Sequence, residues 1–235
     1  MSVLVVAAHP DDEGLGFGAS GARFASEGAD VQACFLSGDA DARGIGNTGA
    51  ALHDRARDAS SVLGFEPPVF GRFPNIALNT VPHLDLVQFI EDAIERSKAT
   101  TVVTHHPGDV NEDHRQVARA AMAAARAGQR NTTGRYPHLQ RLLHMEVLSS
   151  TDWQFPHEGD AFTPNTFIEI AEQHLAAKVR ALSIYEDVVR PRPHPRNAAT
   201  LEALALLRGS QAGYLLSEAF VAAHVGWELP TSGAR

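Results

Sequence analysis

The chain of 235 residues is 44% hydrophobic and 20% charged, an ordinary globular composition that excludes collagenous, coiled-coil and largely disordered proteins. Twenty Lys and Arg against 28 Asp and Glu give a net charge of -8, and no basic cluster is long enough to follow a phosphate backbone, so we expect no nucleic-acid partner. The single cysteine, Cys34, excludes an internal disulfide. Without a signal peptide or about 20 consecutive apolar residues, the sequence predicts a cytoplasmic protein that does not span or bind a membrane.

Apolar strands and helices alternate over about residues 1–130. The first element is a short β-branched run, Val3–Ala8, which is typical of a strand buried on both faces of a parallel sheet. This alternation predicts a Rossmann-like, doubly wound α/β fold with a mostly parallel sheet and helices on both faces. In chain order, the next expected elements are a helix over Gly14–Glu27, a strand over Val31–Leu36, a helix over Ala50–Leu63, a strand over Pro67–Phe73, a helix over Pro82–Ser97, a strand over Thr100–Thr104 and a helix over Glu112–Ala127.

Residues 131–235 are less regular. We expect strands at Leu142–Leu148 and Phe167–Ile170, and helices at Ala171–Tyr185 and Ala198–Arg208. Neither a linker nor an internal repeat divides the chain. We therefore expect a single domain over residues 1–235, in which this second part completes the site.

A polar cluster, His9-Pro10-Asp11-Asp12-Glu13, follows the first strand directly. In doubly wound folds ligands bind at the carboxyl ends of strands, where the positive end of the next helix stabilises ionised acids. A neutral imidazole and a carboxylate three residues apart on such a turn can both reach one cation, which leaves Asp11 for another role. Taken alone, the cluster also fits a helix N-cap surrounded by solvated acids.

A nucleotide-binding interpretation competes for the same region. The segment Gly16–Gly21 has the G-x-G-x-x-G spacing of dinucleotide-binding proteins, and Asp39 or Asp41 lies at the distance expected for a ribose contact. In those proteins the first glycine lies in the turn directly after the strand, whereas Gly16 comes only after the polar cluster. The acids of that cluster would also repel a pyrophosphate. We therefore expect no nucleotide cofactor.

The densest group of potential ligands, Thr104–Arg115, follows the strand at Thr100–Thr104. This strand is the expected neighbour of the first one across a topological switch point, so the two clusters should face each other over one crevice. Together they supply His9, Asp12 and His114, a set with an open coordination position, as catalytic zinc sites require. We expect one Zn²⁺ per chain, although Fe²⁺ and Mn²⁺ accept the same ligands.

Two acids adjacent to these ligands in the sequence, Glu13 and Asp113, are expected to lie just behind them. A metal-binding histidine usually donates its second ring N–H to a carboxylate, a role that suits Asp113. The alternative for Asp113 is an acid that only favours the N-terminus of a helix.

The two clusters resemble those of the LmbE-like enzymes, the PIG-L-type deacetylases related to N-acetylglucosaminyl-phosphatidylinositol de-N-acetylase. By this resemblance the chain is expected to be a zinc-dependent hydrolase that removes the acetyl group from a water-soluble N-acetylated amino sugar or its conjugate. The resemblance covers most of the chain: His9–Glu13, Arg55 with Asp58 and Leu63-Gly64, Asp113-His114, Ser149–Trp153, Phe162 with Pro164-Asn165, and Arg208-Gly209.

The resemblance also implies roles for the site residues. In that family the first His, the second Asp and the later His bind zinc, which corresponds to His9, Asp12 and His114. The first Asp is the general base, so Asp11 is expected to take a proton from the water that attacks the amide carbon.

Two positions depart from the family's pattern. The acid of the family's Arg-x-x-Glu helix is shortened to Asp58 in this chain. Many relatives carry a His three residues before the later metal-binding His, where it steadies the oxyanion, and this chain has Asn111 there. The expected donors to the oxyanion are therefore Asn111, His106 or His194.

Four residues are candidates for contacts with the substrate, each with an alternative. Arg55 is expected to bind a sugar hydroxyl or phosphate, or else to pair with Asp58. Trp153 is either a platform for a sugar ring or a core residue. Alternate prolines make Arg190–Arg196 a loop, whose His194 and Arg196 either receive an anionic group or are simply solvated.

Two other functions stay open. One is an amidase acting on a different amide, such as a thiol-glycoside conjugate. The other is a sugar-binding or regulatory protein without turnover, against which the intact Asp11 argues, because binding alone needs no general base. The sequence leaves the exact substrate and homo-oligomerisation open.

Overall fold

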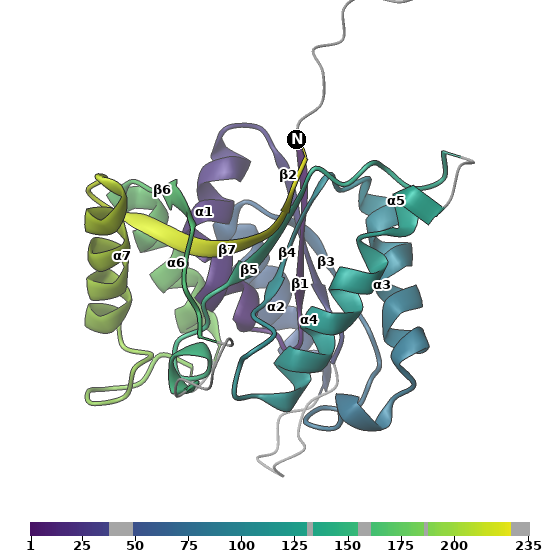
Figure 1. Ribbon diagram of the computed structural model, residues 1–235. Helices are drawn as coiled ribbons and strands as arrows, with labels where there is room; N and C mark the ends of the chain where they lie inside the picture. Colours follow the sequence, from purple (N-terminus) through teal and green to yellow (C-terminus); the bar gives the residue numbers. More distant parts are fainter. Residues whose placement is uncertain (38–48, 131–133, 155–160, 186–187, 227–235) are drawn as a thin grey trace, which may run out of the picture.

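The computed structural model describes residues 1–37, 49–130, 134–154, 161–185 and 188–226. Their strands form one seven-stranded sheet in the order β3-β2-β1-β4-β5-β7-β6 (Figure 1). Strands β1 to β5 pair in parallel, and β7 runs antiparallel to both β5 and β6. The strands are β1 (Ser2–Ala7), β2 (Asp30–Phe35), β3 (Glu66–Phe70), β4 (Thr101–His105), β5 (Arg141–Met145), β6 (Thr166–Glu169) and β7 (Ser217–Val225).

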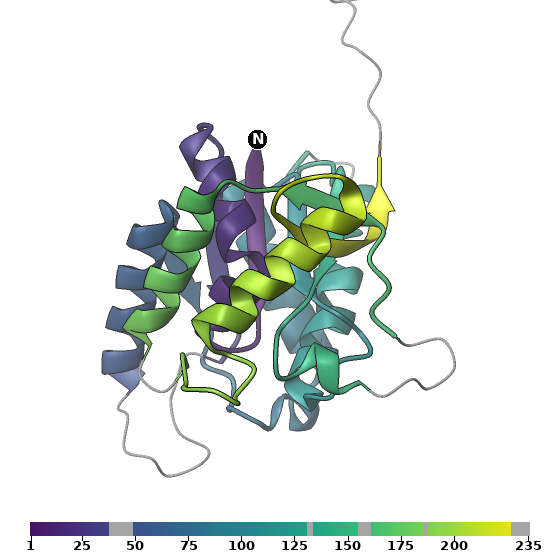
Figure 2. The same ribbon diagram turned by 90° about the vertical axis from the view of Figure 1, so that its left-hand side faces the viewer.

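Helices cover both faces of the sheet. Helices α3 and α4 pack together on one face, while α6 packs against α1 and α2 on the other (Figure 1). The turned view shows α7 crossing the β7 end of that second face (Figure 2). The helices are α1 (Asp12–Ser26), α2 (Gly49–Leu63), α3 (His83–Ser97), α4 (Glu112–Ala124), α5 (Ala127–Arg130), α6 (Glu172–Ile184) and α7 (Ala198–Ala212), with two short 3-10 helices, η1 (Leu78–Thr80) and η2 (Thr151–Trp153).

The predicted doubly wound α/β fold is confirmed, and β4 is the neighbour of β1, as expected. The predicted elements begin and end within a few residues of the observed ones, and four ends differ clearly. The strand expected to reach Phe73 ends at Phe70, and the helix expected to end at Arg208 continues to Ala212. The helix expected to reach Ala127 ends at Ala124, and the short α5 follows it. The strand expected to reach Leu148 ends at Met145, because the chain turns where the Thr151 N–H bonds to the Val147 carbonyl at 2.8 Å.

Strand β7 is not predicted by the sequence patterns. Its residues include three alanines and a buried glutamate, Glu218, which have low β-propensity, so the segment lacks the usual signal of a strand. Strand β7 lies between β5 and β6 and runs antiparallel to both, so the last part of the sheet is antiparallel.

Strand β1 is apolar throughout because it is buried on both faces. Val3 and Val5 belong to the core under α1, α2 and α6, while Leu4 and Val6 belong to the core under α3 and α4. Each such side chain contributes about 1.5–3 kcal/mol when it is fully buried. The two cores therefore fix β1, and with it the loop that follows, from both sides.

Helix α1 approaches its neighbours closely because glycines face them. A Cβ at Gly16 would lie 2.5 Å from the Met145 sulfur, and one at Gly21 would lie 2.3 Å from the Phe65 ring. The glycines with dinucleotide-binding spacing thus allow close packing of a helix. Asp39 and Asp41, the ribose candidates of that interpretation, lie outside the described residues.

A buried ion pair ties α1 to the second half of the chain. Lys178 of α6 donates to Glu218 of β7 at 2.7 Å and to the Leu15 carbonyl of α1 at 2.6 Å. Glu218 also accepts the backbone N–H groups of Ala19 and Ser20, at 3.2 and 2.7 Å. Each charge therefore has several partners, which buried ions require.

Candidate metal centre

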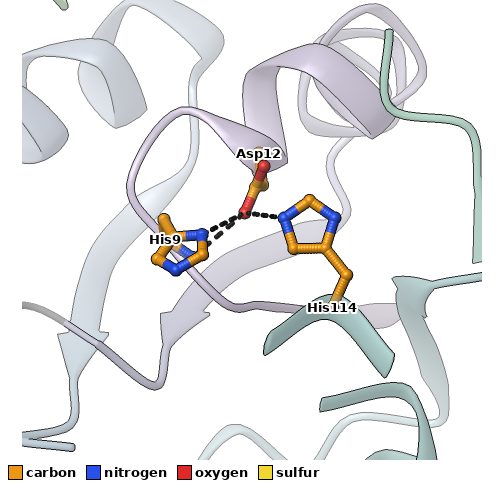
Figure 3. A group of neighbouring side chains, drawn as sticks. All are labelled: His9, Asp12 and His114. Carbon is orange, nitrogen blue, oxygen red and sulfur yellow. Dashed lines mark hydrogen bonds and ion pairs between the residues drawn. The ribbon is translucent and has the colours of Figure 1, made fainter. Parts of the chain in front are cut away.

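Three side chains from two strand ends face one another at the carboxyl edge of the sheet (Figure 3). His9 lies in the loop after β1, Asp12 begins α1, and His114 lies in the first turn of α4. Asp12 Oδ2 is 3.4 Å from His9 Nδ1 and 3.3 Å from His114 Nε2. One ligand atom from each residue lies within 4.8 Å of the other two, so this donor set fits a single divalent cation.

Each of the two histidines is oriented by a carboxylate behind it. His9 Nε2 lies 3.0 Å from Asp113 Oδ2, which leaves Nδ1 directed at Asp12. His114 Nδ1 lies 3.1 Å from Asp109 Oδ2, which leaves Nε2 directed at Asp12. A carboxylate in this position fixes the tautomer of a metal-binding histidine, so the inward nitrogens are free to act as ligands.

Asp109 also belongs to a second close group, with His105 and His114. Its carboxylate is already saturated, because it accepts hydrogen bonds from the hydroxyls of Ser150 and Thr151 as well as facing His114. Asp109 therefore serves as a support for His114, and this second group is a poor metal site.

His105 supports His114 from another side. The two rings stack with centroids 3.8 Å apart and planes 19° apart. His105 Nε2 accepts the backbone N–H of Ala8 at 2.9 Å. Burial, and then the charge of His114, lower the pKa of His105 to about 3. The His105 ring is therefore neutral where it packs against the ring of His114.

The electrostatics favour positive charge at the two ligand histidines. Burial lowers their pKa values, but the hydrogen bond with Asp113 raises the pKa of His9 to about 9, and the charge of Asp12 raises that of His114 to about 10. Burial raises the pKa of Asp12, yet the charge of His114 and the hydrogen bonds with His114 and His9 hold it well below its usual range. The site thus keeps a carboxylate ionised and attracts protons that a divalent cation would displace.

Asp11 adjoins the three ligands in a strained turn. Its φ of 115° lies in a region that residues other than glycine rarely adopt. The Asp11 N–H donates to Glu13 Oε2 at 2.9 Å, and the hydroxyl of Tyr185 donates to Glu13 Oε1 at 2.7 Å. Burial raises the pKa of Glu13 to about 7, against the hydrogen bond from Tyr185. Glu13 therefore holds the backbone of Asp11, and it contacts no ligand histidine.

The side chain of Asp11 is paired with an arginine from the second half of the chain. Arg196 Nη1 donates to Asp11 Oδ2 at 2.9 Å, and Arg196 Nε donates to Ser149 Oγ at 2.6 Å. Burial and the charge of Asp12 raise the pKa of Asp11 to about 6, while the charge of Arg196 opposes them. A carboxylate with a raised pKa beside three side chains that could hold a metal ion is suited to exchange protons near neutral pH.

The two candidate oxyanion donors after β4 have different surroundings. Asn111 caps α4, because its Oδ1 accepts the Asp113 N–H at 2.9 Å, which leaves its Nδ2 as a donor. His106 is buried, accepts the Gly108 N–H at 3.2 Å and meets the ring of Phe162 edge-on. Neither residue belongs to the group of three ligands.

The substrate candidates are spread more widely. Trp153 is 56% exposed, so the core alternative for this residue is wrong, because an indole that open to solvent is not part of the packed interior. Arg55 lies half-buried in α2 and forms contacts of its own. His194 accepts the Arg196 N–H at 3.1 Å and so helps to fold its own loop.

Four supporting residues are not found from the sequence: Asp109, His105, Ser149 and Tyr185. Asp109 and His105 lie within the ligand-rich segment Thr104–Arg115. The general rule that a metal-binding histidine has a carboxylate partner would have pointed to Asp109 as a candidate. Tyr185 is 172 residues from Glu13, and no local pattern marks such a contact.

Comparison with known proteins gives one family match and one related sequence. The model of a family described as PIG-L, GlcNAc-PI de-N-acetylase, matches residues 4–125. An uncharacterized deacetylase of Escherichia coli (strain K12), YaiS, is 29% identical over 192 residues, which cover 77% of this chain and 88% of that protein. The family match includes both polar clusters that form the site.

Solved structures show the same fold. The N,N'-diacetylchitobiose deacetylase of Pyrococcus horikoshii superposes with a TM-score of 0.69 at 16% identity, over 94% of this chain and 83% of that one. GalB, the 4-carboxy-2-hydroxymuconate hydratase of Pseudomonas putida KT2440, superposes with a TM-score of 0.72 at 22% identity, over 97% of this chain and 99% of that one. Because one is a deacetylase and the other a hydratase, the fold alone does not decide the reaction.

Proposed function

The chain belongs to the PIG-L family of GlcNAc-PI de-N-acetylases, and from this premise we propose that it is a metal-dependent N-deacetylase acting on a soluble N-acetyl amino sugar or its conjugate. One observation carries the proposal beyond the family. Asp11 lies beside the three metal-binding side chains, yet its carboxylate is paired only with Arg196 among the described residues. A carboxylate so placed is available for proton transfer and is not needed as a ligand.

The proposed ligands of the cation are His9, Asp12 and His114, and Zn²⁺ suits this combination of two imidazoles and one carboxylate. Fe²⁺ and Mn²⁺ are the alternatives. A divalent cation held there acts as a Lewis acid that polarises the amide carbonyl and makes water more acidic.

The residues of the chain then move one proton. Asp11 accepts it from the water that attacks the amide carbon, and returns it to the nitrogen as the C–N bond breaks, giving acetic acid and an amine. The Nδ2 group of Asn111, or the ring of His106, donates to the carbonyl oxygen while negative charge develops on it.

The proposed substrate is a small, water-soluble molecule. The named activity of the Pyrococcus horikoshii protein is on an N-acetylated sugar, and this chain shares its fold. No helix among the described residues combines the length and the apolarity that crossing a bilayer demands. The exposed ring of Trp153 offers a flat surface to a sugar, while Arg55 and His194 are proposed to contact its polar groups.

The test is release of a primary amine from a panel of N-acetylated sugars, nucleotide sugars and thiol glycosides, detected with fluorescamine. We expect activity with Zn²⁺, Fe²⁺ or Mn²⁺ and its loss after chelation. Elemental analysis of His114→Ala is expected to show loss of bound metal, with His138→Ala, which changes an exposed histidine, as the control. Full metal content in His114→Ala, or a panel without any amine release, would refute the proposal.

A further inference from the structure

We propose that Arg196 is a positioning residue for Asp11, holding one carboxylate oxygen so that the other is the proton acceptor. This assignment rests on the proposed function, because it concerns the group that accepts the proton from water. It replaces the expectation that Arg196 receives an anionic part of the substrate.

The contact between the two side chains is direct and largely shielded from solvent. Arg196 Nη1 lies 2.9 Å from Asp11 Oδ2, and the two side chains are 21% and 13% exposed. Among the described residues, Asp11 Oδ1 accepts no hydrogen bond, whereas Oδ2 accepts the one from Arg196. The two oxygens of the carboxylate are therefore not equivalent, and Oδ1 is the one left to act.

The guanidinium of Arg196 is held on its other edge as well. Its Nε donates to Ser149 Oγ at 2.6 Å and to the Leu148 carbonyl at 3.3 Å, in the turn that follows β5. A guanidinium is planar, so contacts on two edges fix its orientation in a way that a flexible ammonium does not reproduce. The group that faces Asp11 is thus oriented before any substrate binds.

The backbone of Arg196 is equally constrained. Its N–H donates to His194 Nδ1 at 3.1 Å, and its carbonyl accepts the Arg190 N–H at 3.0 Å. The next residue, Asn197, caps α7 by accepting the Thr200 N–H at 3.0 Å. The arginine therefore projects from a loop that is closed by hydrogen bonds and followed directly by a capped helix. This backbone fixes the point from which its side chain extends.

Strained backbone lies at both ends of this contact. Among the described residues, the four non-glycine residues with positive φ are Asp11 at 115°, Ile76 at 57°, Lys98 at 51° and Ser149 at 68°. Asp11 is the group being held, and Ser149 holds the arginine. Backbone strain of this kind persists only where the surrounding structure enforces it. Its position here indicates that the Asp11–Arg196–Ser149 arrangement is enforced.

The arrangement defines the path of one proton. A water O–H bond breaks as the proton passes to Asp11 Oδ1, forming a carboxylic acid there. The water oxygen bonds to the amide carbon, the same proton then leaves Oδ1 for the amide nitrogen, and the C–N bond breaks to give acetic acid and the amine. Arg196 stays on Oδ2 throughout and touches neither water nor substrate.

The first test compares Arg196→Ala with Arg192→Ala, an exposed arginine of the same loop that has no described partner. We expect Arg196→Ala to lower kcat by ~10²-fold with bound metal unchanged and KM altered less than about twofold, because the base is misplaced but substrate binding is intact. Added guanidinium chloride at low concentration should restore part of kcat in Arg196→Ala and leave Arg192→Ala unaffected. A raised KM with unchanged kcat would overturn the proposal in favour of substrate binding.

The second test places the same change in the Asp11→Asn background. If Arg196 acts only through Asp11, the double variant Asp11→Asn/Arg196→Ala should be no slower than Asp11→Asn. A further loss of kcat in the double variant would show a role for Arg196 that bypasses Asp11, and would overturn the proposal.

A third measurement does not depend on turnover. In nitrogen NMR spectra, the guanidinium of Arg196 should show restricted rotation in the parent protein, which is lost in Asp11→Asn and weakened in Ser149→Ala. Failure of the parent to hydrolyse any amide, together with this restricted rotation, would refute the proposed function and leave the contact established. A freely rotating Arg196 in the parent would refute the positioning role even in an active enzyme.

Discussion

Residues 1–130 supply the three proposed metal ligands, whereas residues 134–226 supply the arginine that pairs with Asp11 and the tyrosine that bonds to Glu13. His9 and Asp12 are three residues apart, and both carboxylates behind the ligand histidines, Asp109 and Asp113, lie close to His114 in the sequence. The second half contributes Tyr185 and Arg196, together with hydroxyl donors to Asp109.

For the proposed function, this difference implies that metal binding and proton transfer depend on separate parts of the chain. The ligands are arranged by local turns at two strand ends, while the base is arranged by contacts over long sequence separations. Changes among the ligands should therefore alter metal content first. Changes in the second half should alter rate or stability while the metal stays bound.

The largest effect is expected for Asp12→Asn. A neutral amide is a poor ligand for a divalent cation, so this variant should lose its metal and all measurable activity together. Elemental analysis and the amine-release assay measure the two losses. Asp30→Asn, an exposed acid on β2, is the control and should keep both. Full metal content in Asp12→Asn would remove it from the ligand set.

The next effect is expected for Asp11→Asn, which differs from the previous variant by one position in the sequence. The amide is nearly isosteric and the ligands are untouched, so metal content should be normal. The rate should fall by ~10²–10⁴-fold, the usual worth of a general base. Turnover of Asp11→Asn at the rate of the parent would show that another group takes the proton.

A smaller effect concerns pH and His144, on β5 in the second half. Burial lowers the pKa of His144 from 6.5 to about 4, aided by the charge of His106 and opposed by the hydrogen bond to the His105 carbonyl. The unfolded chain binds this proton below pH 6.5, while the folded protein binds it only near 4. The contribution of His144 is therefore fully present above pH 6.5 and is lost as the pH falls towards 4, by about 3 kcal/mol at most.

The variant His144→Asn keeps a donor for the His105 carbonyl and cannot titrate. Its free energy of unfolding, measured with urea, should fall less steeply than that of the parent between pH 6.5 and 4. Metal content at neutral pH should be unchanged. An identical pH dependence in both proteins would contradict the assignment to this ring.

The smallest effect is expected for Asp113→Asn, in the first half. The residue touches no metal, but it orients His9, and loss of such a partner typically lowers metal affinity by ~10–100-fold. Competition with a chelator measures the affinity. At saturating metal the rate should approach that of the parent. The comparison between the halves fails if Arg196→Ala weakens metal binding as much as Asp113→Asn does.

The proximity of the three candidate ligands could be predicted from the sequence, because His9 and Asp12 follow β1 and His114 begins the helix after β4. The rule that parallel strands present one common edge brings these two clusters together. The same rule predicted that β1 and β4 are neighbours. Both inferences use only local patterns and the geometry of a doubly wound sheet.

The positioning of Asp11 could not be predicted in this way. Arg196 reaches it across 185 residues, from a loop whose course depends on how α6 and α7 pack. The alanines of β7 give no strand pattern, so neither this antiparallel strand nor the contacts of Glu218 could be predicted. Contacts of this kind depend on tertiary structure that no segment of the sequence encodes alone.

The packing of α1 determines how the protein can be divided or recombined. Within the segment 4–125 that matches the family, α1 carries Asp12, yet Gly14, Gly16 and Gly18 of this helix lie against side chains from residues 145–182. A glycine inside a helix costs about 1 kcal/mol relative to alanine, so a helix with so many holds its shape only while the second half covers it. The half of the chain with the proposed ligands is therefore not expected to fold alone or in a chimaera with an unrelated second half. A recombinant protein that keeps the proposed metal site needs both halves of this chain.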